Sequence, residues 1–265
     1  MLSLPEVFLR FRLSIFLYWA MSAAFLGYWV LYFESKEVTA SEIGMMMSLY
    51  TGAALFGQYC FGYLSDKLRS IRLLVMMAAL LLAVSVMTFP FQSNLARIYP
   101  CMAIVGFLQQ PIGPMLGSWA LKNLSLHGQE HLFGRIRGFG SLGWATAALL
   151  TSYLITYLSW NMMFVVCMAA GLLLCITVTM IPDISQPKSG LVGTGKEPAT
   201  DDSPLTLTRA LRHLFANPAY VYILAVVFLM YLGVQTTFNF QGYIIKNSGG
   251  GVLDLGWTFF VGVMS

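Results

Sequence analysis

The chain has 265 residues, of which 58% are hydrophobic and 10% charged, whereas a soluble domain is charged at about a quarter of its residues. Together with a mean hydropathy of +0.73, this composition excludes a water-soluble globular protein. The net charge of +4 does not point to nucleic acid, because the basic residues stand at the ends of apolar runs and form no basic patch.

Uncharged runs dominate the first part of the chain. A helix needs about 20 residues to cross a bilayer, and the last of these runs is long enough for two helices, which we divide at Leu158–Ser159–Trp160–Asn161. The sequence therefore predicts six transmembrane helices, within residues 13–33, 43–65, 73–96 and 98–121 and, in two parts, 138–182.

The composition changes after this region to Pro, Gly, Lys, Asp and Ser, which predicts a cytoplasmic linker over residues 183–216. Its last part is amphipathic, with Arg209 and Arg212 suited to the membrane surface. Residues 217–265 begin a second bundle with a seventh span at 218–243. The eighth span stops at Ser265, too short to cross, so we expect a fragment, with residues 1–182 as the N-terminal six-helix bundle.

The basic residues also predict an orientation, because Lys and Arg are retained in cytoplasmic loops. With the N-terminus in the cytoplasm, only Lys36, Arg97 and Lys246 of the 15 Lys and Arg residues fall outside. We therefore expect a multi-pass protein of the cell inner (plasma) membrane, surrounded by lipid and monomeric.

The loop after the second predicted span resembles the signature loop of the major facilitator superfamily. Gly62 can permit a close helix approach, Asp66 can cap or face a helix N-terminus, and basic residues can pair with Asp66 or with lipid phosphate. The resemblance implies an all-α, six-plus-six transporter bundle in which this loop latches the cytoplasmic side; the alternative is an ordinary positively charged loop. The predicted gating residues are Gly62, Asp66, Lys67, Arg69 and Arg72.

The segment that enters the fifth span, residues 133–144, resembles the lactose permease and related oligosaccharide and nucleoside proton symporters. That resemblance implies that Arg137 binds solute hydroxyls and that Trp144 stacks on a sugar ring, while Ser141 shares their helix face. Arg137 could instead be an anchor at the membrane surface. Trp119 stands where the permease has a sugar-binding Glu, so we do not carry over recognition of galactosides.

Other polar residues in the spans are candidate solute ligands. Tyr18 belongs to a stripe on the first span that predicts either a cavity wall or a helix-packing face. Gln110 precedes a Pro/Gly cluster that is expected to kink the fourth span. Gln235 and Asn239 lie on one face of the seventh span, where they contact solute or join helices by hydrogen bonds.

No nucleotide-binding loop, catalytic motif or metal-ligand cluster is visible, so we predict neither an enzyme nor a cofactor, and take a proton as the coupling ion. The leading hypothesis is a secondary transporter that takes up a sugar, nucleoside or organic acid by alternating access. The alternatives are an exporter of drugs or metabolites with the same fold and a membrane receptor that does not transport.

Overall fold

Helices make up the structure, a computed structural model that describes residues 4–68, 70–92, 94–181, 212 and 215–264. Within those ranges there is no strand, as expected for a chain whose backbone must satisfy its own hydrogen bonds in lipid. The predicted all-α fold is confirmed. Most of the predicted linker, including Arg209, lies outside the described residues.

The chain divides into two units, Met1–Ser185 with Gly242–Ser265, and Gln186–Gln241. The second contains the single long helix α9 (Pro218–Asn239). The helices of the first unit are α1 (Leu4–Leu26), α2 (Trp29–Glu34), α3 (Ala40–Leu68), α4 (Ile71–Val86), α5 (Leu95–Ser125), α6 (Phe133–Tyr157), α7 (Met162–Thr179), α10 (Gln241–Asn247) and α11 (Val252–Met264), with short 3-10 turns at Phe89–Phe91 and Glu130–Leu132.

Three of these segments are long and apolar enough by composition to cross a membrane: Glu6–Glu34, Ile71–Phe91 and Met162–Thr179. α3, α5 and α6 are also long, with 29, 31 and 25 residues. The turn predicted near Trp160 is present between α6 and α7. The first predicted span differs, because the helix breaks at Gly27–Tyr28 and resumes as α2.

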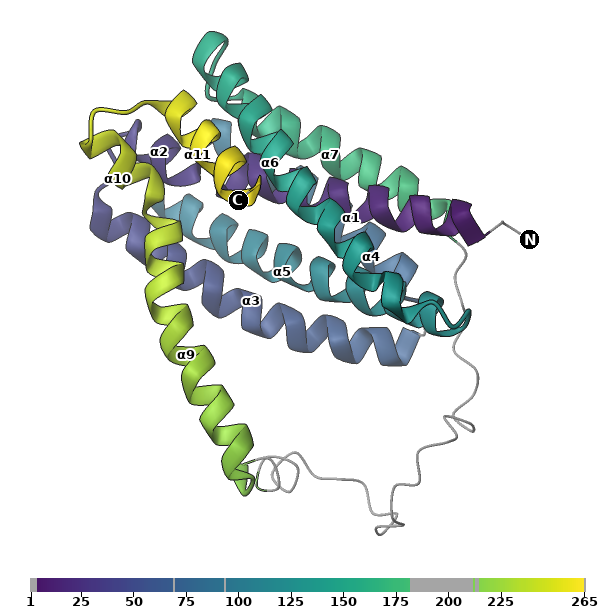
Figure 1. The fold of residues 1–265 in the computed structure, drawn as a ribbon. Helices are drawn as coiled ribbons and strands as arrows, with labels where there is room; N and C mark the ends of the chain where they lie inside the picture. Colours follow the sequence, from purple (N-terminus) through teal and green to yellow (C-terminus); the bar gives the residue numbers. More distant parts are fainter. Residues whose placement is uncertain (1–3, 69, 93, 182–211, 213–214, 265) are drawn as a thin grey trace. The chain divides into compact units, whose positions relative to one another are not determined.

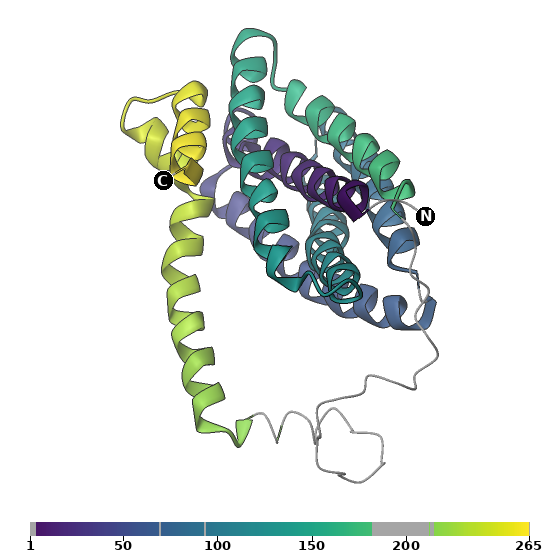
Figure 2. The ribbon, with the colours of Figure 1, turned by 45° about the vertical axis from the view of Figure 1, so that its right-hand side comes forward.

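α1 lies among other helices of the first unit and packs against α5, α6 and α7, as Figures 1 and 2 show. α3 runs beside α5, α4 packs against α5 and α7, and α11 packs against α6. Several residues of the stripe on the first span pack against other helices in this structure: Ser14, Ser22 and Phe25 are buried.

Glycines allow two of these helix pairs to touch at their backbones. A Cβ atom at Gly143 of α6 would lie 2.2 Å from the carbonyl oxygen of Phe16 in α1, and one at Gly57 of α3 would lie 2.2 Å from that of Phe107 in α5. Small residues make such approaches possible where no water drives helices together.

α5 is continuous from Leu95 to Ser125 although it contains three prolines, so the Pro/Gly cluster does not interrupt it. Pro111 has no N–H, which leaves the carbonyl of Phe107 without its helical donor. Gly57 of α3 packs against this carbonyl, and a Cα–H···O contact there can satisfy part of its hydrogen-bonding capacity.

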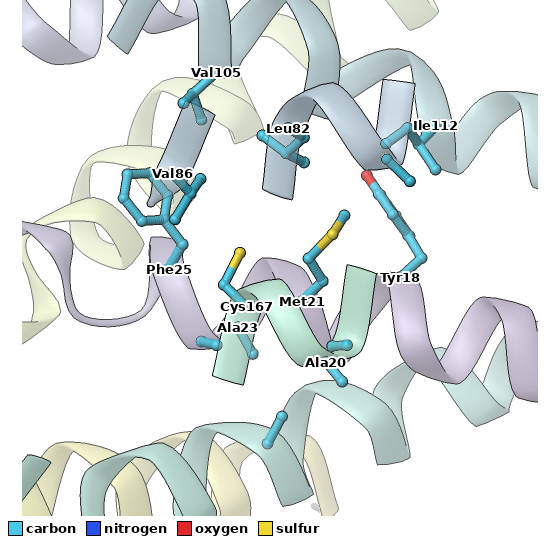
Figure 3. Packing of buried hydrophobic residues seen from close by; sticks show 14 of the residues in the cluster. Tyr18, Ala20, Met21, Ala23, Phe25, Leu82, Val86, Val105, Ile112 and Cys167 are labelled. Carbon is cyan, nitrogen blue, oxygen red and sulfur yellow. The ribbon is translucent and has the colours of Figure 1, made fainter. Parts of the chain in front are cut away.

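The core between α1, α4, α5 and α7 is filled by aromatic, branched aliphatic, sulfur-containing and small side chains (Figure 3). Met21 of α1 lies near Cys167 of α7, with Leu82 of α4 opposite, and each is almost fully buried. Cys167 serves here as a small apolar residue. The side chain of Tyr18 extends towards Ile112 of α5.

Candidate functional site

A chain of hydrogen bonds joins α1, α3 and α5. The hydroxyl of Tyr18 donates to the main-chain carbonyl of Gln109 at 3.4 Å, and the hydroxyl of Tyr50 donates to Oε1 of Gln109 at 3.3 Å. Nε2 of Gln110 donates to the Tyr50 hydroxyl at 2.9 Å. The structure therefore brings together two predicted site residues, Tyr18 and Gln110, through Tyr50 and Gln109.

The direction of these bonds fixes what Gln110 offers to a ligand. Its amide nitrogen is held by Tyr50, while its Oε1 has no partner among the described residues. Gln110 is half-buried, whereas Tyr18, Tyr50 and Gln109 are buried. An amide oxygen and a second N–H of this kind can bind a hydroxyl group, which both donates and accepts.

Tyr50 was not predicted. It stands in an apolar run without a charged or periodic pattern around it, so the sequence carries no local signal for it. Its position follows from the α3–α5 crossing, where a Cβ atom at Gly106 would lie 2.2 Å from the Tyr50 carbonyl oxygen.

The three residues of α6 that were predicted to bind solute differ in their exposure. Arg137 and Ser141 are exposed, one helical turn apart. Trp144 is buried, and its ring meets Trp19 of α1 and Phe259 of α11 edge-on, at centroid distances of 6.0 and 5.8 Å. Arg137 and Ser141 therefore lie at the surface of the described structure, whereas the Trp144 ring is enclosed by its neighbours.

The interior carries no negative charge in the part of the chain that the structure describes. Its buried polar residues are all uncharged: Ser14, Ser22, Gln109, Asn123, Thr151 and Ser152. The guanidinium of Arg12 lies 5.3 Å from the ring centroid of Phe139 on α6, a cation–π contact.

The predicted gating loop lies at the opposite end of α3 from residues 34–40. Asp66 lines a cavity of about 410 Å³ with Gln58 and Ser65 of α3 and with Pro111, Pro114 and Ser118 of α5. Lys67 is exposed and Arg72 half-buried; Arg69 lies outside the described residues.

Two details predicted for this loop are wrong. The N-terminus of α4 is capped by Ser70, whose hydroxyl accepts from the Leu73 N–H at 3.3 Å, and not by Asp66, which still belongs to the last turn of α3. Among the described residues, no atom beyond the glycine's chain neighbours and its own helix backbone lies within 4 Å of a Cβ atom placed on Gly62. The close approach occurs instead at Gly57, one and a half turns earlier, because α3 meets α5 there.

The two predicted residues of the seventh span belong to the other unit. Asn239 is the last residue of α9, and the side chain of Gln235 lies outside the described part of the chain. Over the described ranges, no group of three or more His, Cys, Asp and Glu side chains gathers as a metal site would require.

The model of the MFS_1 like family matches residues 8–265. The chain belongs to this family. It is thus a member of the major facilitator superfamily, and its helices are those of a multi-pass membrane protein, as predicted.

Two relatives extend this assignment. The chain is 25% identical to the maltose permease of Geobacillus stearothermophilus over 227 residues, which cover 85% of the chain and 53% of the permease. It also resembles the crystal structure of a mutant of the nucleoside transporter NupG, with a TM-score of 0.73, 19% identity and coverage of 90% of the chain and 58% of NupG. The second likeness supports the fold alone. The chain spans little more than half the length of either protein.

Proposed function

We propose that the protein is a secondary active transporter that takes up a small polar solute, a sugar or a nucleoside, together with protons. The observation that carries the proposal is the uncharged network of Tyr18, Tyr50, Gln109 and Gln110 within a bundle of the major facilitator superfamily. Neutral donors and acceptors suit a hydroxyl-rich solute, because they need no counter-charge.

Arg137 and Ser141 add donors on α6, and a guanidinium can hold two solute oxygens at once. The similarity to a maltose permease supports a sugar as the solute. An organic acid is the second solute class compatible with Arg137, because a carboxylate would neutralise it.

The transport cycle that we propose is alternating access, in which two six-helix halves move about a central site. The Asp66 loop would control the cytoplasmic end, and residues 34–39 would lie outside. The distribution of Lys and Arg supports this orientation, and we propose the cell inner membrane as its location, with the N-terminus in the cytoplasm. No oligomer is needed for this cycle, so we propose a monomer.

Uptake by cells that express the intact protein tests the proposal. Radiolabelled maltose, uridine and lactate are supplied separately, with and without a protonophore, and compared with cells that carry an empty vector. We expect protonophore-sensitive accumulation of maltose or uridine. Accumulation of lactate alone would assign the site to an organic acid, and faster efflux than in control cells would support an exporter.

A further inference from the structure

One ion pair joins segments far apart in sequence at the Glu34 end of the bundle. Oε1 of Glu34, the last residue of α2, lies 2.7 Å from Nζ of Lys246 in α10, and 212 residues separate the two. The side chains of Lys246 and Glu34 are 55% and 19% exposed. Oε2 of Glu34 is covered and has no hydrogen-bond partner among the described residues, so Lys246 is the main compensation for this carboxylate.

The surroundings of the pair form a seam between α2 and the segment that follows α9. Beneath the pair is a cavity of about 200 Å³, lined by Leu31, Glu34, Ser35 and Trp160 on one side and by Gly242, Lys246 and Gly250–Val252 on the other. A Cβ atom at Gly242 would lie 3.0 Å from Cγ of Leu31, so the two segments are in van der Waals contact.

α11 closes the same end of the bundle by packing on α6. A Cβ atom at Gly256 would lie 2.1 Å from Oγ of Ser152 and 3.2 Å from the Tyr28 hydroxyl. The ring of Phe259 meets those of Tyr28 and Trp144 edge-on, at centroid distances of 6.3 and 5.8 Å. Ser152 is fully buried at this contact.

The residues at the contact between α11 and α6 allow the two helices to separate. Residue 256 is a glycine, so no α11 side chain at this position has to leave the α6 surface when the two helices separate. A partly exposed ion pair contributes little by itself, so it can bias such a seam without locking it.

From these observations we infer that Glu34 and Lys246 form the latch of a gate, in which α10 and α11 close the Glu34 end of the bundle against α2 and α6. The inference rests on the proposed alternating-access cycle, which requires this end to open. When the pair breaks, α11 separates from α6, and Ser152 becomes accessible from the aqueous phase on that side.

Cysteine labelling of the intact protein in membrane vesicles tests the gate. Ser152→Cys is introduced after Cys60, Cys101, Cys167 and Cys175 have each been replaced by alanine, and a membrane-impermeant maleimide reads its accessibility. The reagent is supplied on whichever side labels Lys36→Cys, an exposed residue at the same end, so the result does not depend on the proposed orientation.

We expect slow labelling of Ser152→Cys in the parent, and labelling up to about fivefold faster after Glu34→Gln or Lys246→Gln, the range that a partly exposed pair can supply. The charge reversal Glu34→Lys with Lys246→Glu should restore slow labelling. Lys36→Gln is the matched control, because it removes a positive charge at the same end of the bundle. The Lys36 ammonium group lies over the Tyr32 ring and forms no ion pair among the described residues.

Unchanged labelling in both single variants, or a reversed pair that labels as fast as the singles, would overturn the gate. Each variant's abundance and thermal unfolding in detergent are measured in parallel, and an increase in labelling counts for the gate only if the unfolding temperature is unchanged. Because labelling needs no solute, an inactive uptake assay with these shifts would reject the proposed function and retain the gate.

Discussion

At the residue scale, the candidate site depends on how Tyr50 orients two glutamine amides. Sequence patterns identified Tyr18 and Gln110 as separate candidates, since a hydroxyl and an amide in apolar spans are unusual. They could not identify Tyr50, because an aromatic residue in a membrane helix is common and its bond to Gln110 requires the crossing of α3 with α5. Helical spacing alone places Arg137 and Trp144 on one face, but in the structure Arg137 is exposed and Trp144 is buried.

Tyr50→Phe removes the hydroxyl that accepts from Gln110 and donates to Gln109. We expect the KM for the transported solute to rise about fivefold, the equivalent of about 1 kcal/mol for a lost hydrogen bond, with kcat little changed. Initial uptake rates at increasing solute concentration measure both.

Tyr59→Phe is the control for this substitution, because Tyr59 lies on the same helix and is 72% exposed. Equal KM values for the two variants would show that the network does not orient the site.

At the element scale, the limits of the helices were predictable where charge, Pro or a polar turn marks them, as between α6 and α7. The break at Gly27–Tyr28 was not, because glycine alone is tolerated in a membrane helix. Its cause is tertiary: the Tyr28 hydroxyl donates to the Ala148 carbonyl of α6 at 2.5 Å, which holds the chain where α1 ends.

The crossing of α3 with α5 predicts opposite effects for two glycines of one helix. Gly57→Ala places a methyl group 2.2 Å from the Phe107 carbonyl oxygen, whereas Gly52→Ala meets nothing within 4 Å. Overpacking at Gly57 should cost about 1–3 kcal/mol, and Gly52→Ala should be neutral or slightly stabilising, because alanine favours helix more than glycine does.

Thermal unfolding of the purified protein in detergent measures this difference. The same unfolding temperature for both variants would contradict the close crossing.

The start of α3 is held by a reciprocal cap. Oε2 of Glu42 accepts from the Thr39 N–H at 2.8 Å and from its hydroxyl at 2.7 Å, and the Thr39 hydroxyl accepts from the Glu42 N–H. The hydrogen bonds from the hydroxyl and main chain of Thr39 lower the pKa of Glu42 below its usual value of 4.5. The cap is therefore fully present above pH 4.5, and it is lost as the pH falls through the lowered pKa.

Amide hydrogen exchange in the first turn of α3 reports this cap, when the protein is compared with Glu42→Ala at the same pH. We expect faster exchange in the variant at pH 7 and a difference that shrinks in acid. A difference that does not depend on pH would mean that the carboxylate is not the group responsible.

At the scale of the whole molecule, composition was enough to predict a membrane-embedded all-α chain, and one loop and one segment were enough to predict its superfamily. The packing of α10 and α11 against α2 and α6 could not be predicted, because it joins residues more than a hundred positions apart. The Glu34 end of the bundle therefore depends on a partner that comes after α9 in the chain, whereas the Ser70 cap of α4 is a local signal.

Asp66→Asn tests the cytoplasmic gate. Asp66 lines the cavity between α3 and α5 and caps no helix, so its loss should leave membrane insertion intact. If its charge stabilises one endpoint of the cycle, we expect slower uptake at unchanged protein abundance, by about tenfold for a coupling near 1.4 kcal/mol. Unchanged uptake would restrict the loop to setting orientation.

The central claim is that the intact protein moves a polar solute across the membrane. It is tested most directly in sealed proteoliposomes that contain the purified protein and carry an imposed pH gradient, alkaline inside, with labelled maltose or uridine outside. We expect the solute to accumulate inside above its external concentration and this accumulation to collapse when a protonophore is added. Saturable binding without any entry into the vesicles would contradict it and would assign the protein to the receptor class.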